Sequence, residues 1–159
     1  MRAVLQRVSS AKVIANKSYQ ASIGRGLLVL LGITQSDTME DLDWLLNKII
    51  NMRIFNDEVA LMNKSVLDVA GELLVVSQFT LYAQTKKGNR PSYIQAAGHE
   101  IAVPLYTHFL QKATQLMGKP VQSGIFGADM QIDLTNDGPV TIIIDSKNKD
   151  LWIFKMPKK

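Results

Sequence analysis

The chain has 159 residues, 47% of them hydrophobic and 20% charged, so it can bury a sizeable core and is not a disordered tail protein. The 18 basic and 14 acidic residues give a net charge of +4, which permits a polyanionic partner such as RNA without requiring one. Because there is no cysteine, the sequence excludes a disulfide framework, a thiolate nucleophile and a cysteine-based zinc site.

The N-terminal part of the chain predicts strands. Residues 2–23 are rich in strand-forming side chains and contain a turn signal at Asn16-Lys17, which indicates two strands. After a second turn at Gly24-Arg25-Gly26, residues 27–31 (LLVLL) lack any polar alternation and predict a strand buried on both faces. No apolar run approaches the ~18 residues of a membrane helix, and residues 1–7 carry charge too early for a signal peptide. We therefore expect a cytoplasmic protein with no membrane partner.

A first helix is predicted from residue 37 onward. Asp37 can cap this helix, while Glu40, three residues later, returns the hydrogen bond in a capping box. Side chains at helical spacing then define one buried side: Leu42, Leu45, Leu46, Ile49 and Ile50, followed by Arg53.

The middle of the chain predicts two further strands and a loop. The strands are expected over residues 61–67 and 73–82, joined around Gly71-Glu72. Residues 85–92 (TKKGNRPS) are rich in charge and turn formers and predict the loop.

A second helical region is predicted over residues 92–117. Pro104 suits the first turn of its main helix, and Gly118 closes it. The remaining strands are expected at residues 127–134, 140–145 and 151–154. The sum is an α+β fold, a mostly antiparallel, barrel-like sheet with two inserted helical regions in a single domain over residues 1–159.

Familiar catalytic equipment is missing from the sequence. The two histidines, His99 and His108, are nine positions apart with Pro104 between them, which is not the spacing of a metal-binding pair on a helix. There is no nucleophile elbow, no P-loop and no complete dinucleotide fingerprint. We therefore expect that any enzymatic activity uses no histidine base, no metal and no cofactor.

The segment Ser77-Gln78-Phe79-Thr80-Leu81 is unusually polar for the end of an apolar strand. The simpler interpretation is the polar outer face of a half-buried strand, in which Gln78 and Thr80 lie on one side and Ser77 and Phe79 on the other. The functional interpretation is a binding site at the strand end, beside the basic loop.

The segment Asn136-Asp137-Gly138-Pro139-Val140-Thr141 combines several turn-forming residues. Its simpler interpretation is a tight hairpin turn between two strands. The Gly138-Pro139 bond is also one in which the cis form costs only ~0.5–1 kcal/mol. A cis bond would turn two carbonyls outward as a rigid acceptor pair able to read an amino group and its stereochemistry.

Three segments in this order, SQFTL at 77–81, GNRPSY at 88–93 and NDGPVT at 136–141, resemble the D-aminoacyl-tRNA deacylases. The opening Met1-Arg2 with Gln6-Arg7-Val8, and GIFGADM at 124–130, are also similar to that family. The resemblance extends over essentially the whole chain. It implies a cytoplasmic homodimer that hydrolyses the ester between a D-amino acid and the 3′-terminal adenosine of tRNA, with active sites at the subunit interface and without a metal or cofactor.

The resemblance also implies roles for individual residues. A cis Gly138-Pro139 bond would project into the partner's pocket, hold the substrate's amino group and exclude L side chains, and Arg7 would lock it in place. Met130 would belong to the same chiral-selection site. Changes at Gly138 would then alter chirality, and glycyl-tRNA would be admitted because glycine has no side chain to exclude.

At the ester end of the pocket, the resemblance places Ser77, Gln78, Phe79 and Thr80. Either Thr80 is a nucleophile, or backbone N–H groups, including that of Phe79, act together with the ribose 2′-OH. The residue inventory favours the second mechanism, because Thr80 has no base near it in sequence. Three cations of the 85–92 loop are candidate tRNA contacts: Lys86, Lys87 and Arg90.

Two other functions stay open at this point. One is a nucleic-acid-binding homodimer without catalysis that uses the same basic surfaces. The other is an RNA-editing domain of this fold that acts on a different mischarged ester. The SQFTL and NDGPVT segments together favour catalysis, because a binding module has no evident need for both.

Overall fold

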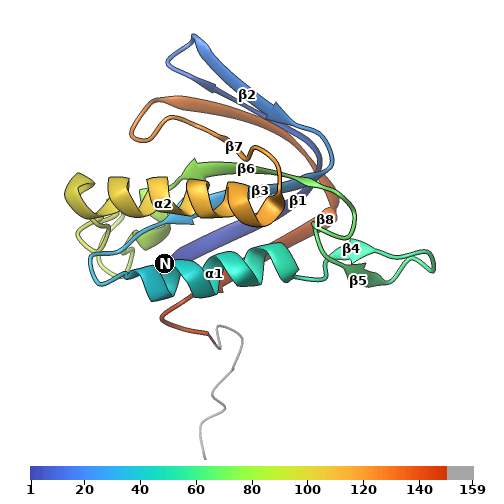
Figure 1. Cartoon of the computed structure of the whole chain (residues 1–159). Helices are drawn as coiled ribbons and strands as arrows, with labels where there is room; N and C mark the ends of the chain where they lie inside the picture. Colours follow the sequence, from blue (N-terminus) through green and yellow to red (C-terminus); the bar gives the residue numbers. More distant parts are fainter. Residues whose placement is uncertain (150–159) are drawn as a thin grey trace, which may run out of the picture.

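The chain folds into a strongly curled sheet with two helices packed on one side of it (Figure 1). The computed structural model describes residues 1–149. The elements follow one another as β1 (Arg2–Ala15), β2 (Tyr19–Ile23), β3 (Gly26–Gly32), α1 (Met39–Asn51), β4 (Phe55–Asn56), β5 (Met62–Lys64), β6 (Glu72–Ser77), the 3₁₀ helix η1 (Phe79–Tyr82), α2 (His99–Met117), β7 (Gln122–Ser123) and β8 (Met130–Asp145).

The long strand β1 pairs with three others. Its residues 2–8 pair with β3, its residues 11–15 pair with β2, and β8 runs along its other edge. Beyond β3 the sheet continues through β6 and β7, and these last two pairings are parallel. The Tyr19 hydroxyl of β2 donates to the Ser123 carbonyl of β7 at 3.0 Å, so the sheet nearly closes on itself. The predicted α+β, barrel-like sheet is confirmed, with a mixed rather than a purely antiparallel strand order.

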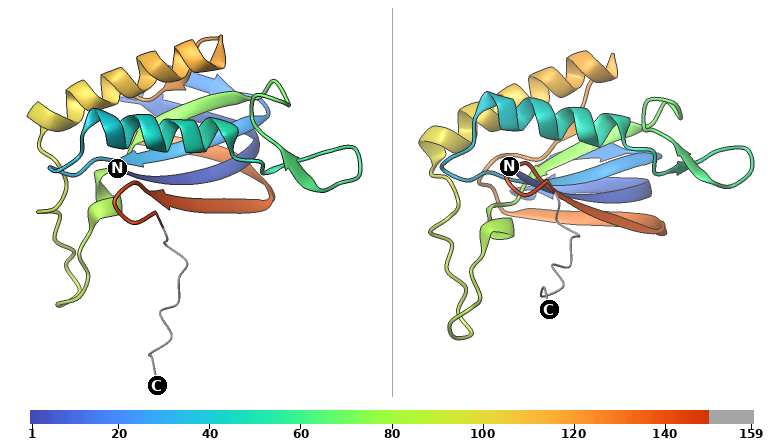
Figure 2. Two further views of the ribbon diagram at one scale, coloured as in Figure 1. Left: turned by 60° about the horizontal axis from the view of Figure 1, so that its bottom comes forward. Right: turned by 90° about the horizontal axis from the view of Figure 1, so that it is seen from below.

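Two apolar clusters fill the two faces of the sheet. Alternate residues of β3 belong to different clusters: Leu27, Val29 and Leu31 pack under the helices, whereas Leu28 packs on the opposite face. Strand β6 alternates in the same way. The prediction that residues 27–31 are buried on both faces is therefore confirmed, and the views of Figure 2 show the helices covering one face only.

Helix α1 begins one residue later than predicted. Its N-cap is Thr38, whose backbone N–H donates to Asp41 Oδ2 at 2.9 Å, rather than Asp37 paired with Glu40. Asp37 is instead engaged by the buried Met1 ammonium group and by the Thr34 N–H at 2.8 Å. The predicted apolar side is correct, because all five of its leucines and isoleucines are buried.

A short charged network ties β8 to α1. Ser146 Oγ accepts from the Met1 ammonium group at 2.6 Å and donates to Asp41 Oδ1 at 2.7 Å. Burial raises the pKa of Asp41, but hydrogen bonds from Lys147, Ser146 and Thr38 outweigh it and hold that pKa well below its usual value. Asp41 is therefore charged at neutral pH, and this junction is a charge-assisted one.

Two predicted strands end early. Over residues 61–67 only Met62–Lys64 is extended, because Asp68 accepts from the Ser65 N–H at 2.7 Å and starts a turn. The strand expected over residues 73–82 stops at Ser77, where the chain turns into η1. The predicted alternation of faces from Phe79 onward is consequently wrong.

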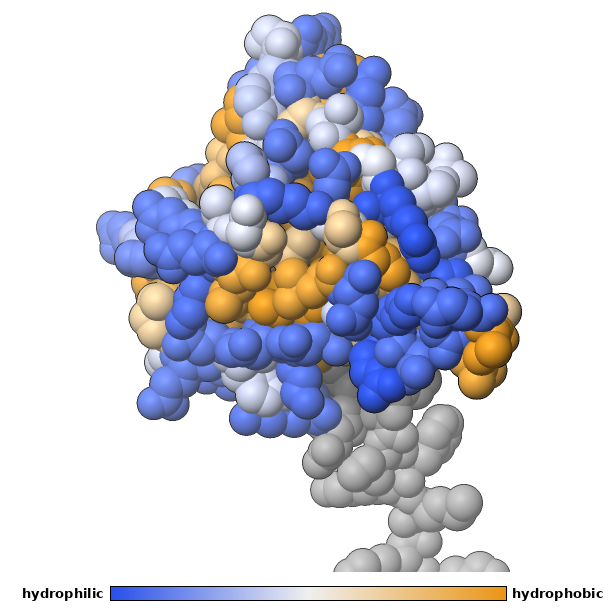
Figure 3. All heavy atoms as spheres, turned by 45° about the vertical axis from the view of Figure 1, so that its right-hand side comes forward, coloured by the Kyte–Doolittle hydropathy of each residue, from blue (hydrophilic) through white to orange (hydrophobic). Residues whose placement is uncertain are grey.

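The hairpin formed by β4 and β5 projects from the body (Figure 1). It carries three exposed apolar side chains: Val59, Leu61 and Met62. Figure 3 brings this side of the molecule forward and shows hydrophobic areas among a mostly hydrophilic surface.

Helix α2 begins at His99, after the N-cap Gly98, and not at Pro104. Pro104 occupies the sixth helical position, where its missing N–H removes a single bond near the helix start. Gly118 ends the helix in the left-handed region at φ 65°, as predicted. In the part of the chain that the structure describes, no helix is both long and apolar enough to cross a membrane.

The two strands expected at residues 127–134 and 140–145 are one strand, β8. Both halves pair with β1 in the same direction, so the Asn136–Thr141 segment is not a hairpin turn. It is an irregularity within a continuous antiparallel ladder. The strand predicted at residues 151–154 lies outside the described residues.

The buried hydroxyls of two tyrosines give a stability prediction. Among residues 1–149, Tyr82 Oη is the buried side-chain polar atom without a hydrogen-bond partner, whereas Tyr106 Oη donates to the Val75 carbonyl at 3.0 Å. Removing an unpaired buried hydroxyl is close to neutral or stabilising, whereas removing a paired one costs about 1 kcal/mol. We expect Tyr82→Phe to retain the wild-type free energy of unfolding and Tyr106→Phe to lower it, as measured by urea denaturation. Equal losses in the two variants would contradict this assignment.

Candidate functional site

A cavity of about 560 Å³ opens where β3 and β6 end. These are parallel strands, and the region beyond the carboxyl ends of parallel strands is a common place for ligand sites. The wall is completed by η1, by the start of α2 and by the segment before β8. It is lined by Leu31, Ile33, Val76, Ser77, Gln78, Phe79, Tyr93, Ala96, Ala97, His99, Ala102, Phe126, Gly127, Ala128, Met130 and Ile132.

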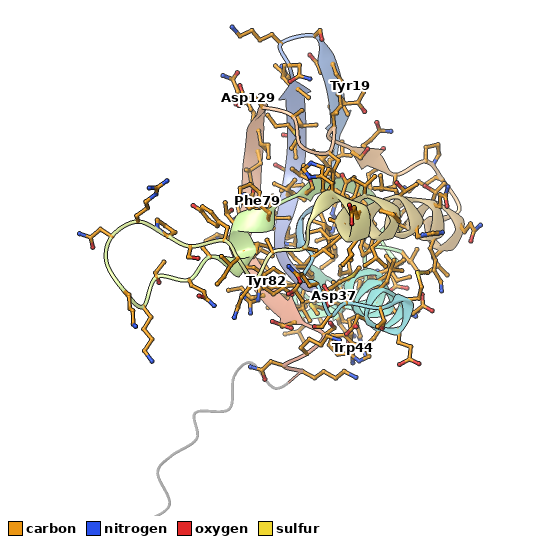
Figure 4. The ribbon with its side chains drawn as sticks, turned by 90° about the vertical axis from the view of Figure 1, so that its left-hand side faces the viewer. Tyr19, Asp37, Trp44, Phe79, Tyr82 and Asp129 are labelled. Atoms are coloured by element: carbon orange, nitrogen blue, oxygen red, sulfur yellow. The ribbon has the colours of Figure 1, made fainter. Side chains whose placement is uncertain are left out.

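Four of the predicted site residues line this cavity: Ser77, Gln78, Phe79 and Met130. Strand β6 is buried as far as Val76, and the Gln78 N–H then donates to the Leu31 carbonyl at 2.8 Å before the chain curls into η1. Because Gly124 has no side chain, it leaves room for the Met130 sulfur. A side chain at residue 124 would displace that sulfur. Figure 4 shows Phe79 on η1, on the opposite side of that turn from Tyr82.

Thr80 lies next to the cavity but is not part of its lining. Its Oγ1 accepts a hydrogen bond from the Gln78 side-chain amide at 2.5 Å. A neutral amide donates a proton and cannot remove one from a hydroxyl. Within residues 1–149 no carboxylate, amine or imidazole is hydrogen-bonded to Thr80 Oγ1, and no three His, Asp or Glu side chains are grouped to hold a metal ion.

The backbone N–H groups of Phe79 and Thr80 are free donors at the end of β6. They stand at the start of η1, and neither is hydrogen-bonded to any other of residues 1–149. The first N–H groups of a helical turn lack intrahelical partners and favour a negatively charged ligand. Phe79 lines the cavity, and Thr80 follows it in the chain.

An aromatic part of the wall was not predicted from the sequence. His99, the first residue of α2, packs edge-on against Phe126 with 5.5 Å between ring centroids, and Tyr93 meets Phe79 at 5.1 Å. His108, in contrast, is exposed on the helix surface. No periodicity points to His99, Phe126 or Tyr93, although two of them lie within the GIFGADM and GNRPSY segments.

Gly138 and Pro139 lie in β8, away from the cavity of their own chain. The peptide bond between them is cis, and both residues are exposed. Gly138 has φ 127°, and a Cβ there would lie 2.8 Å from Arg7 Nη2 and 2.9 Å from Val140 Cγ2. Only glycine fits this position without displacing its neighbours.

Arg7 reaches this segment from β1. Its Nε donates to the Asp137 carbonyl at 3.0 Å, and its Nη1 donates to the Ile54 carbonyl at 2.7 Å. Arg7 is buried, and the Asp137 carboxylate lies 3.3 Å from its Nε. The guanidinium therefore joins the residue before Gly138 to the start of the β4–β5 hairpin.

The chain beside the cavity mouth carries positive charges and no negative ones. From residue 73 to residue 99 there is no Asp or Glu, and this stretch contains Lys86, Lys87 and Arg90. All three are exposed in a loop whose base is closed by paired hydrogen bonds between Gln84 and Ser92. Figure 2 shows this loop projecting from the body. Because Tyr93 follows Ser92 and contacts Phe79, the loop is anchored at the cavity.

Comparison with known proteins places this site in a family. The family model for D-Tyr-tRNA(Tyr) deacylase matches residues 4–145. A D-aminoacyl-tRNA deacylase of Bacteroides thetaiotaomicron is 57% identical over 150 residues, which cover 94% of this chain and 100% of the relative. One of Christiangramia forsetii with the same name is 60% identical over 149 residues, covering 94% and 99% of the two chains.

A solved structure supports the same relationship. The c-Myc DNA Unwinding Element Binding Protein is similar with a TM-score of 0.85 and 42% sequence identity, covering 91% of this chain and 98% of that one. The matches therefore extend over the sheet, both helices, the cavity and the β8 segment alike. The chain belongs to the D-Tyr-tRNA(Tyr) deacylase family.

Proposed function

We propose that this protein hydrolyses the ester that links a D-amino acid to the 3′-terminal adenosine of tRNA. Water is consumed, the ester C–O bond breaks, and free D-amino acid and tRNA are released. The observation that carries the proposal is the cavity at the ends of β3 and β6, together with the free N–H of its lining residue Phe79 and the basic loop beside it. The names of the family and of its curated members point to the same reaction.

The chemistry at the ester end rests on backbone donors rather than on a side-chain nucleophile. An aminoacyl ester is already activated, so stabilisation of the developing oxyanion by fixed N–H donors can suffice. The N–H of Phe79 is the donor in the wall, and the ribose 2′-OH of the substrate assists. Ser77 and Gln78 shape this end of the cavity, and Gln78 holds the Thr80 hydroxyl.

Selection between D and L esters is assigned to the Gly138-Pro139 segment of a second subunit. Both residues are exposed and outside their own cavity, so they can reach a site only in another copy of the chain. In the homodimer their carbonyls would hold the substrate's amino group in the partner's cavity, next to Met130. A rigid backbone at this point excludes an L side chain but leaves room for many different D side chains. Glycine has no side chain to exclude, so glycyl-tRNA is a further substrate.

A second candidate function is nucleic-acid binding without catalysis. The specific observation in its favour is the name of the structural relative, which is described as binding a DNA unwinding element. The basic loop suits either function, whereas the cavity beside it suits hydrolysis alone.

Hydrolysis of matched D- and L-tyrosyl-tRNA by the purified protein, with EDTA present, tests the proposed function. We expect rapid loss of the D ester and survival of the L ester, because an L side chain meets the Gly138-Pro139 backbone. Survival of both esters, with RNA binding intact, would favour the binding function. Cleavage of both esters would contradict the proposed role of Gly138-Pro139 in chiral selection.

Thr80→Ala separates the two mechanisms. With backbone donors in place, we expect kcat to fall by less than about tenfold, whereas loss of a covalent nucleophile costs on the order of 10⁶ in kcat. Thr107→Ala, on the exposed side of α2, is the matched control. Complete loss of turnover in a folded Thr80→Ala protein that still binds tRNA would establish Thr80 as the nucleophile.

The basic loop is proposed to contact the tRNA backbone through Lys86, Lys87 and Arg90. The double variant Lys86→Ala/Lys87→Ala should raise KM and reduce the slope of log KM against log salt concentration by roughly 1.4–1.8, because each phosphate contact contributes about 0.7–0.9. Lys48→Ala/Lys119→Ala removes the same charge from the last turn of α1 and from the residue after the α2 C-cap Gly118, and should leave the slope unchanged. An unchanged slope in the loop variant would place the RNA elsewhere.

A further inference from the structure

The register between β1 and β8 shifts on both sides of Val8, and the larger shift lies between Gln6 and Val8. Gln6 pairs with Thr141 and Val8 pairs with Asn136, so residues 137–140 of β8 lie opposite the single residue Arg7 of β1. We call residues 137–140 the excursion. Its backbone lacks the ladder bonds that fix the rest of β8, so side chains must determine the direction in which Gly138 and Pro139 project.

One side-chain atom joins the two ends of the excursion. Gln6 Oε1 accepts from Asn136 Nδ2 at 2.8 Å and from the Thr141 hydroxyl at 2.6 Å. Asn136 in turn accepts from the Val140 N–H at 3.4 Å through its Oδ1. The residue before the excursion and the residue after it are thus held at a fixed separation by a single glutamine oxygen.

Arg7, the next residue of β1, holds the excursion at a different point. Arg7 contacts the Asp137 carbonyl, and successive residues of a strand point to opposite faces. Arg7 therefore fixes one point within the excursion, and Gln6 fixes its two ends. A segment held only by Arg7 is free to pivot about Asp137, which would move the Gly138 and Pro139 carbonyls.

We infer that Gln6 is a positioning residue for chiral selection, acting through Asn136 and Thr141 on the direction of the Gly138-Pro139 backbone. The inference rests on the proposed function, in which that backbone reads the substrate's stereochemistry. Gln6 is half-buried and does not belong to either apolar cluster, so its acceptor oxygen, and not its bulk, is its contribution. Displacement of a positioning group by about 1 Å can cost on the order of 100-fold in rate.

The test compares two substitutions at Gln6, one that removes the acceptor oxygen and one that keeps an acceptor oxygen. Gln6→Met keeps the length of the side chain and removes the acceptor, whereas Gln6→Glu keeps an acceptor oxygen in the same place. Gln20→Met makes the same chemical change at an exposed position of β2, away from the excursion, and is the control. The measurement is kcat/KM for D-tyrosyl-tRNA and for L-tyrosyl-tRNA, with the melting temperature of each protein.

We expect Gln6→Met to lower the ratio of D to L hydrolysis by about tenfold or more, because a loosened excursion no longer excludes the L side chain and no longer holds the D ester in place. Gln6→Glu and Gln20→Met should stay within about threefold of the wild-type ratio. A change in general stability alone would alter the melting temperature and leave the ratio unchanged.

Two results would overturn the inference: an unchanged ratio in a folded Gln6→Met protein, or a loss of the ratio in Gln6→Glu as large as in Gln6→Met. If Gln6→Met does not fold, Thr141→Val, which removes one of the two donors without changing side-chain shape, takes its place and should lower the ratio. Wild-type protein that leaves D-tyrosyl-tRNA intact would instead refute the proposed function, so the two failures are distinguishable.

Discussion

The pairing of β1 with three other strands is the constraint on which the rest of the structure depends. Strand β1 is bound to β3 over its first half and to β2 over its second half, with β8 along its whole other edge. The pairing with β3 ends at Val8 and the pairing with β2 begins at Ala11. The sheet curls so that β2 comes within reach of β7, where Tyr19 meets Ser123.

The unusual segment of β8 lies next to the point where β1 passes from β3 to β2. The register between β1 and β8 shifts twice there, and four residues of β8 lie opposite Arg7. Gly138 tolerates the positive φ that this path requires, and Gln6 and Arg7 supply the hydrogen bonds that the ladder lacks. The segment proposed to read the substrate's stereochemistry is thus an irregularity within an otherwise continuous ladder.

The cavity arises separately, from the parallel pairing of β3 and β6. Both strands stop at the same edge, and β6 ends in the tight turn of η1, whose first N–H groups remain free. The wall is mostly apolar, and the cations of the 85–92 loop are exposed beside it. Such a site is suited to a neutral ester attached to a polyanion, because the apolar cavity takes the aminoacyl group while the exposed cations meet phosphates outside.

The sequence by itself determined the local features whose cause is local: the double-faced burial of residues 27–31, the apolar side of α1, the left-handed end of α2 at Gly118 and the basic loop. It also marked SQFTL and NDGPVT as candidate site segments, because they are distinctive as motifs. Tertiary structure decided where those segments lie. Asp37 binds the Met1 ammonium group instead of capping α1. Phe79 lies in η1 rather than in a strand, and Asn136–Thr141 is part of a continuous strand paired with β1. Partners distant in sequence decided each of these outcomes, and nearest-neighbour patterns carry no information about such partners.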